Sequence, residues 1–181
     1  GGYSSFLIAV ILGTIYYISN SLDRINRSLT DVDEFILDIE TIDDHFAEQA
    51  KDRKNLFLRG HNSDDLEKYL GEVNNLTQSI RDSTRRALGN PLSKSYKADL
   101  EIFLQDHSEL MEVYLQGVDL LKRTQDYREG DQFVRGEGKG VGKILDQILA
   151  QLKDDRQKLF VKNQQDIQVF LLTSTAALIV V

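Results

Sequence analysis

The longest regular pattern in the sequence is an alternation of three- and four-residue spacings between apolar positions over Leu22–Arg59. This is the repeat of an α-helix that buries one seam against partner helices. At 1.5 Å per residue, such a helix reaches roughly 57 Å. Asp43 and Arg53 fall on the same seam and interrupt it. The apolar positions of the seam are Leu22, Ile25, Leu29, Val32, Ile36, Ile39, Phe46, Ala50 and Phe57.

Turn and capping residues divide the next part of the chain into two further amphipathic helices. We expect Gly60 to take the left-handed conformation that closes the first helix, and Asn62 or Ser63 to cap the second. The second helix then runs to about Leu88. A third predicted helix, capped by Ser93, reaches about residue 123.

A polar segment, Thr124–Asp131, is expected to be a connection without helical structure. The pattern between Asp131 and Val141 favours neither helix nor loop. From Val141 a fourth amphipathic helix continues through Leu159 towards an apolar C-terminal segment.

Both ends of the chain are apolar. Residues 2–19 carry no charge and are about long enough to cross a ~30 Å hydrocarbon core. A cleaved signal peptide is the alternative, but no basic region precedes this segment and no clear cleavage site follows it. Residues 169–181 are also uncharged, and we expect them to be the beginning of a second membrane helix that is cut short.

These elements predict an all-α protein, an up-down-up-down four-helix bundle flanked by two transmembrane helices. The expected divisions are a first transmembrane helix at residues 1–19, a helical-bundle domain at 20–167 and the start of a second transmembrane helix at 168–181. The chain has one Pro and no Cys, which suits long helices and excludes disulfides and thiolate metal sites. Its net charge of −7 argues against nucleic-acid binding.

Two runs of sequence add to a resemblance in the order of the predicted helices and membrane spans. The first, residues 52–60 (DRKNLFLRG), lies at the expected membrane-distal end of the first helix; the second is residues 130–138 (GDQFVRGEG). Together with a span, a helical domain and a second span, the chain resembles the extracytoplasmic sensor modules of bacterial transmembrane receptors. These are methyl-accepting chemotaxis transducers, sensor histidine kinases and membrane cyclases, and the second run looks like a feature of cyanobacterial members.

The resemblance implies a homodimer in the bacterial inner membrane, with its central domain on the extracytoplasmic, periplasmic side. It implies that a small anionic ligand or a periplasmic binding protein is read at the distal end, and that movement of the fourth helix passes to a cytoplasmic output domain outside this chain. No cofactor is expected. The alternative is a membrane-anchored helical-bundle subunit that assembles into a larger complex and senses nothing.

Arg53 is the most informative single residue, because a guanidinium on a buried seam needs a compensating partner. It pairs with an acidic residue of another helix, turns towards solvent, or acts with Arg59 to bind an anion such as a carboxylate. We take Arg53, Arg59, His61 and Arg135 as the candidate ligand-binding residues.

Other chemistry finds little support in the sequence. The run of residues 136–143 (GEGKGVGK) fails the phosphate-loop pattern, because Glu137 replaces the first glycine and Ile144 stands where Ser or Thr binds magnesium. Its glycines four apart either let another backbone approach closely or mark a flexible break. His107 interrupts an apolar stripe and is expected to be a hydrogen-bonded core residue. We expect no catalytic residue, no metal site and no enzyme activity in this chain.

Overall fold

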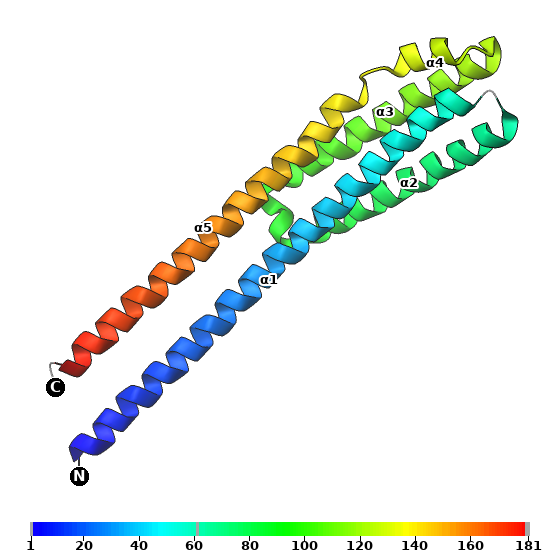
Figure 1. Cartoon of the computed structure of the whole chain (residues 1–181). Coiled ribbons are helices and arrows are strands. Elements are labelled where there is room, and N and C mark those ends of the chain that lie inside the picture. Colours follow the sequence, from blue (N-terminus) through cyan, green and yellow to red (C-terminus); the bar gives the residue numbers. More distant parts are fainter. Residues whose placement is uncertain (1, 61, 180–181) are drawn as a thin grey trace. The chain divides into compact units, whose positions relative to one another are not determined.

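The computed structural model describes residues 2–60 and 62–179, and the side chains of residues 4–60 and 62–175. Within these residues all regular structure is helical, so the predicted all-α class is confirmed. The elements follow one another as shown in Figure 1. They are α1 (Gly2–Arg59), α2 (Ser63–Gly89), the 3-10 helix η1 (Pro91–Ser95), α3 (Lys97–Thr124), α4 (Tyr127–Val134) and α5 (Gly138–Ile179).

The chain forms two compact units. The core unit comprises Phe35–Gln151, which includes α2, η1, α3 and α4 together with parts of α1 and α5. The paired-helix unit comprises Gly1–Glu34 and Leu152–Val181, which belong to the outer parts of α1 and α5. Each unit has its own side-chain contacts, described in turn below.

Helix α1 is one uninterrupted helix, because no Pro falls in it and its two glycines, Gly2 and Gly13, stand in its first turns. It ends at Arg59 as predicted, but Gly60 does not take the expected left-handed conformation. The lack of room for a side chain explains why residue 60 is a glycine. A Cβ on Gly60 would lie 2.3 Å from the Leu56 carbonyl oxygen and 3.0 Å from Leu66 Cδ1. The turn is therefore closed by close packing.

The start of α2 agrees with its predicted cap, whereas the start of α3 does not. The Asn62 side chain accepts a hydrogen bond of 3.0 Å from the backbone N–H of Asp64. Ser93, predicted to cap α3, lies in η1, and its hydroxyl donates to the Leu88 carbonyl at 2.9 Å. Helix α3 begins four residues later without a side-chain cap at Tyr96. The serine therefore closes α2 rather than opening α3.

The expected polar connection at Thr124–Asp131 is wrong, because α4 occupies most of it. Gln125 ends α3 in the left-handed region (φ 58°), and Asp126 caps α4 by accepting from Arg128 N at 2.8 Å. Helix α4 packs on α3, with Val134 buried against Gly117 (Figure 1). After it, Gly136 turns the chain at φ 91° and α5 begins.

Aromatic and aliphatic side chains fill the core unit. Phe46 packs edge-to-face on Phe103 with ring centroids 6.0 Å apart. The ring centroids of Phe35 and Tyr96 are 5.9 Å apart. Two positions of the predicted seam of α1, Leu22 and Ala50, are exposed. Four residues of α1 that are spaced seven positions apart are all buried, and we call them the seven-residue series: Phe35, Ile42, Gln49 and Leu56.

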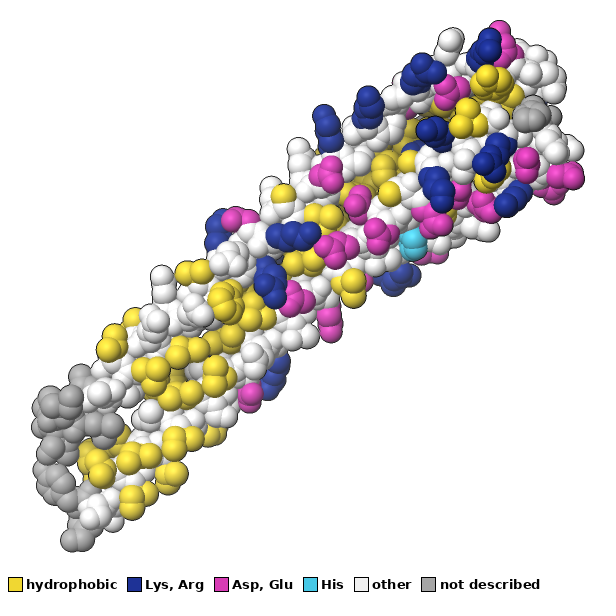
Figure 2. Space-filling model, in the orientation of Figure 1, with side chains coloured by type: hydrophobic (Ala, Val, Ile, Leu, Met, Phe, Trp, Pro, Cys, Tyr) yellow, Lys and Arg dark blue, Asp and Glu magenta, His cyan; other side chains and the backbone are white. Residues whose placement is uncertain are grey.

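The outer segments of the paired-helix unit expose apolar side chains. Among the described residues, one helix, α1, is long and apolar enough to cross a membrane, judged by length and composition. Its N-terminal segment exposes Phe6, Ile8, Leu12 and Ile15, and Figure 2 shows hydrophobic side chains gathered on this unit. On α5, Val169 and Leu172 are likewise exposed. The second transmembrane helix stays a prediction, and part of it lies outside the described residues.

Candidate functional site

Arg53 of α1 is a charged side chain inside the core unit. It is 2% exposed, and its Nε and Nη1 atoms have no hydrogen-bond partner among the described residues. No carboxylate forms an ion pair with it in that part of the chain. The alternative in which Arg53 pairs with an acidic residue of another helix is therefore not what the structure shows, nor does the side chain turn to solvent.

Two aromatic faces enclose the guanidinium. Its Cζ lies 4.3 Å from the ring centre of Tyr114 on α3 and 5.3 Å from that of Phe46 on α1. Each contact is worth about 2 kcal/mol for a desolvated cation. Burying an unpaired cation costs several kcal/mol, and each unpaired N–H group adds about 1–3 kcal/mol. The rings offset only part of this cost, and burial lowers the pKa of Arg53 from its ordinary value.

A chain of hydrogen bonds lies beside Arg53. The Nε2 atom of His107 lies 3.0 Å from Oε1 of Gln49, which is fully buried, and the Gln49 amide donates to Thr77 Oγ1 at 2.7 Å. Burial, then Arg53 and then Arg81 lower the pKa of His107 to about 4. His107 is therefore neutral at physiological pH, a hydrogen-bonded core residue as the sequence predicted.

The first turn of α5 lies against the same guanidinium. A Cβ on Gly138 would lie 3.3 Å from Arg53 Nη2, and one on Gly142 would lie 3.3 Å from Phe46 Cε1. The predicted close approach of another backbone is not what these glycines allow, since the neighbours of Gly138 and Gly142 are side chains and nothing lies within 4 Å of the Cβ position of Gly140. No acidic residue stands in the first turn of α5, and Glu137 directly precedes it.

Arg59, the second predicted ligand residue, lies away from the Arg53 site and is exposed. Arg59 donates from Nη1 to the Tyr69 hydroxyl at 3.1 Å. It lines a polar groove of about 610 Å³ with three carboxylates, from Glu48, Asp52 and Glu72. Lys51 is the second cation of the groove, so its three carboxylates outnumber its two cations and leave it with a net negative charge.

Arg135 and His61 complete the predicted set. The exposed Arg135 is paired within its own neighbourhood, since its Nη2 lies 2.6 Å from Asp131 Oδ2. His61 lies outside the described residues. Among the described residues of the predicted set, Arg53 is buried whereas Arg59 and Arg135 are exposed.

Sequence reasoning missed Gln49, Tyr114 and Gly138 as neighbours of Arg53. Gln49 had a usable signal, because it is the polar member of the seven-residue series on α1. Tyr114 lies on another helix, and no spacing in the sequence connects it to Arg53. Only packing reveals that Gly138 lies over the guanidinium.

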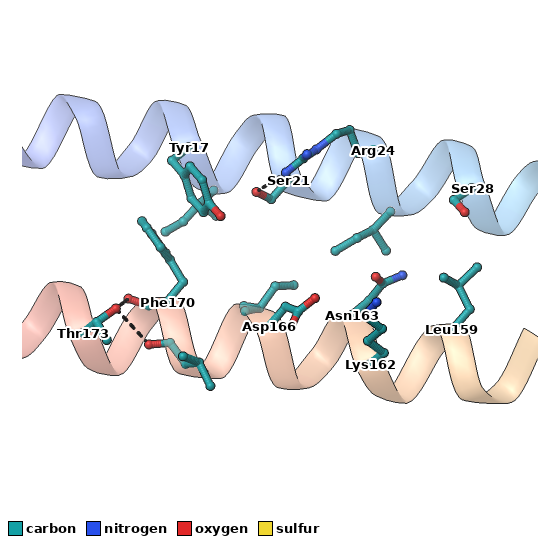
Figure 3. A pocket seen from close by; sticks show the side chains of 14 residues that line it. Tyr17, Ser21, Arg24, Ser28, Leu159, Lys162, Asn163, Asp166, Phe170 and Thr173 are labelled. Atoms are coloured by element: carbon teal, nitrogen blue, oxygen red, sulfur yellow. Dashed lines mark hydrogen bonds between the residues drawn. The ribbon is translucent and has the colours of Figure 1, made fainter.

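A second cavity lies within the paired-helix unit. It has a volume of about 560 Å³ between α1 and α5 and mixes apolar, polar and charged side chains, as Figure 3 shows. Tyr17 and Phe170 stack at one end with ring centroids 4.1 Å apart. The Asn163 amide nitrogen is buried without a partner among the described residues, and Arg24 Nη2 lies 3.4 Å from Ser21 Oγ.

Metal chemistry is not indicated within the described residues, where no group of three or more His, Asp or Glu side chains is placed to hold a metal ion. No protein-family model, curated protein or solved structure matches the chain. The function is therefore argued from the helices and from the Arg53 site.

Proposed function

We propose that the chain is the sensing and signal-transducing module of a bacterial transmembrane receptor. In this proposal two transmembrane helices anchor an up-down-up-down four-helix bundle on the extracytoplasmic side of the inner membrane. The bundle acts as a homodimer and passes a displacement of α5 to a cytoplasmic output domain. The module itself has no enzymatic activity.

The observation that carries the proposal is the continuity of α1 from Gly2 to Arg59. Its first part is exposed and apolar enough to cross a membrane, and its last part supplies core residues from Phe35 to Phe57. A helix without a break transmits a translation or rotation along its whole length, because its backbone hydrogen bonds resist bending. A binding event in the core unit can therefore reach the membrane.

Helix α5 supports the same proposal from the other end. It runs from Gly138 to Ile179 and buries Val141, Leu145 and Ile148 in the core unit. Its later part exposes Val169, Leu171 and Leu172, which suits contact with lipid. The core unit is thus connected to the outer segments by two long helices.

Membrane topology is tested by labelling a single thiol. The chain has no Cys, so Ser63→Cys at the exposed start of α2 places one thiol in the core unit. An impermeant maleimide is expected to label this variant on intact cells. Labelling only after permeabilisation would place the core unit in the cytoplasm and overturn the orientation. The double change Ile8→Asp and Leu12→Asp is expected to reduce retention in alkali-washed membranes, since each charge costs about 3 kcal/mol at the bilayer centre.

Signal transmission is tested with a fusion of the whole chain to the cytoplasmic half of a sensor kinase. One to four alanines are inserted at the junction, each rotating the output by about 100°. Reporter activity is expected to vary with the helical period if α5 transmits movement. An output independent of the insertions would overturn the sensor proposal and favour the alternative, a membrane-anchored assembly subunit.

A further inference from the structure

We infer that the polar groove between α1 and α2 binds a small primary ammonium ion, whose charged group lies against the carboxylate of Asp52. The groove is the one of about 610 Å³ that Arg59 lines. The inference deepens the proposed function, because it names the chemistry of the ligand, and its signalling consequence rests on that proposal. Binding itself is measurable without it.

Asp52 is the residue that carries the inference. Its side chain lies in the core unit and is only 9% exposed. No hydrogen bond or ion pair joins its carboxylate to another residue in the part of the chain that the structure describes. Neither carboxylate oxygen is fully enclosed, so the unpaired group opens into the groove that Asp52 lines. A buried carboxylate without a partner destabilises the fold, and a cation bound in the groove would supply that partner.

Hydrogen bonds between α1 and α2 hold the groove on both sides of Asp52. Three residues earlier on α1, the Gln49 amide donates to Thr77 Oγ1 of α2 at 2.7 Å. Seven residues later, Arg59 Nη1 donates to the Tyr69 hydroxyl of α2 at 3.1 Å. The two helices are therefore fixed against each other at both ends of the segment that contains Asp52. The groove is formed before a ligand enters it, which lowers the entropy lost on binding.

The charges of the groove do not balance one another. Glu48 on α1 and Glu72 on α2 add two carboxylates to that of Asp52. The cations of the groove are Lys51 and Arg59. Within the described residues, none of these five side chains forms an ion pair. The surplus of one negative charge attracts a monovalent cation and repels an anion, whereas a zwitterion would leave the surplus in place.

The acceptors of the groove favour a primary ammonium ion over a metal ion. Its three carboxylates do not converge, since no group of three or more His, Asp or Glu side chains among the described residues is placed to hold a metal ion. A primary ammonium group has three N–H donors, which separate acceptors can receive, and the amides of Asn55 and Asn75 add to the carboxylates.

The rest of the lining sets the body of the ligand. Tyr69 is the one aromatic residue among the described side chains of the groove, so no aromatic cage for a quaternary ammonium ion is formed there. Leu76 provides apolar surface for a short alkyl chain. The ligand is therefore a small alkylammonium ion.

The site also gives a route to α5. An ammonium ion shared by Asp52 of α1 and Glu72 of α2 would draw these two helices together, because it contacts both. The next residue, Arg53, packs against the first turn of α5, where a Cβ on Gly138 would lie 3.3 Å from its Nη2. A movement of this turn of α1 would therefore shift α5, the displacement that the proposed function requires.

Binding is tested on the purified full chain in detergent by titration calorimetry at constant ionic strength. The probes are propylammonium, tetramethylammonium, β-alanine, propanoate and Ca²⁺. Propylammonium is expected to bind at one site. The other four are expected to bind at least about tenfold more weakly, because each lacks either the N–H donors or the net positive charge that the groove selects.

Four variants test the residues of the site. Asp52→Asn keeps the shape and removes the charge, and it is expected to weaken propylammonium binding by about tenfold or more. Glu72→Gln is expected to weaken it as well. Arg59→Gln removes a like charge and is expected to leave binding equal or tighter. Asp38→Asn makes the same change as Asp52→Asn at an exposed position of α1 outside the groove, and it is the matched control that leaves binding unchanged.

Several results would overturn the inference. They are no propylammonium binding, equal binding by Asp52→Asn and wild type, weaker binding by Arg59→Gln, or binding of any other probe as tightly as propylammonium. Folding is followed separately by thermal unfolding. Asp52→Asn is expected to melt at or above the wild-type temperature, because it removes an unpaired buried charge.

The site and the proposed function fail separately. A helical-period response of the alanine-insertion fusions without propylammonium binding would overturn this site and leave the sensor proposal. Propylammonium binding without that response would overturn the sensor proposal and leave the site.

Discussion

The imidazole Nε2 of His107 lies 3.0 Å from the side-chain oxygen of Gln49, a residue 58 positions earlier in the chain. The pair connects α3 to α1 inside the core unit, and Gln49 continues the chain of hydrogen bonds to Thr77 of α2. Three helices thus share one polar chain of hydrogen bonds inside the core unit. Arg53 and Arg81 are the cations whose fields reach that histidine.

This arrangement predicts a loss of stability in mild acid. The pKa of His107 is about 4 in the folded protein and 6.5 in the unfolded chain, so between these values the unfolded state binds more protons. The free energy of unfolding therefore falls as the pH drops from 6.5 to about 4, by about 3 kcal/mol from this group, and levels off below. Denaturant unfolding at pH 7 and at pH 4.5 measures the change.

The matched control is His107→Gln, which keeps a donor for Gln49 and removes the titration. Other groups act in the same pH range; Asp43, for example, has its pKa raised by burial and then by Asp146. The difference between wild type and variant isolates His107. If the free energies of unfolding of wild type and His107→Gln differ by the same amount at both pH values, His107 has its ordinary pKa in the folded protein.

The contact between α3 and α4 predicts a costly glycine substitution. A Cβ on Gly130 would lie 2.9 Å from Phe57 Cε1 and 3.0 Å from the Gly117 carbonyl oxygen, so either the ring or the backbone must move. Gly130→Ala is expected to lower the free energy of unfolding by about 1–3 kcal/mol. Gly71→Ala is the control. No atom lies within 4 Å of its Cβ position, and it is expected to raise stability by up to about 1 kcal/mol. Similar effects of the two changes would contradict the close α3–α4 packing.

The ion pair of the paired-helix unit predicts a small, salt-sensitive effect. Arg156 donates from Nε and Nη2 to the two carboxylate oxygens of Asp33, and this hydrogen bonding lowers the pKa of Asp33. Both side chains are exposed, so Asp33→Asn is expected to cost no more than about 1 kcal/mol and to cost nothing in 1 M salt. Because the pKa is lowered, the contribution is present at neutral pH and lost in acid.

Thermal unfolding of Asp33→Asn at low and high salt checks this prediction. Asp31→Asn, at an exposed position on the same helix, is the control. A large loss of melting temperature that persists in 1 M salt would mean that the pair is shielded from solvent.

Much of the helical framework was predictable because its causes are local. The end of α1 at Arg59 and the capping of α2 by Asn62 follow from glycine, asparagine and the first polar residues after an apolar repeat. The predictions that failed concern short segments where packing outweighs propensity. Helix α4 is eight residues long and contains Gly130, and it forms because that glycine allows close contact with α3.

The candidate site was predictable only in part. Arg53 was identified because a charge on an apolar seam breaks a periodic pattern, and periodicity is a property of sequence. Its supposed partner Arg59 lies among carboxylates instead. Side chains six positions apart on a helix point in directions about 120° apart, so the two arginines face different neighbours. Gln49 was overlooked although it belongs to a regular series.

The sequence by itself determined that this chain is helical, where its long helices break and which faces they bury, since each depends on residues only a few positions apart. The tertiary structure alone decided what Arg53 meets. Phe46, Tyr114 and Gly138 surround it, from positions 7, 61 and 85 residues away along the chain. No spacing rule encodes such contacts, because side-chain volume and the balance of buried charge select them only once the helices pack.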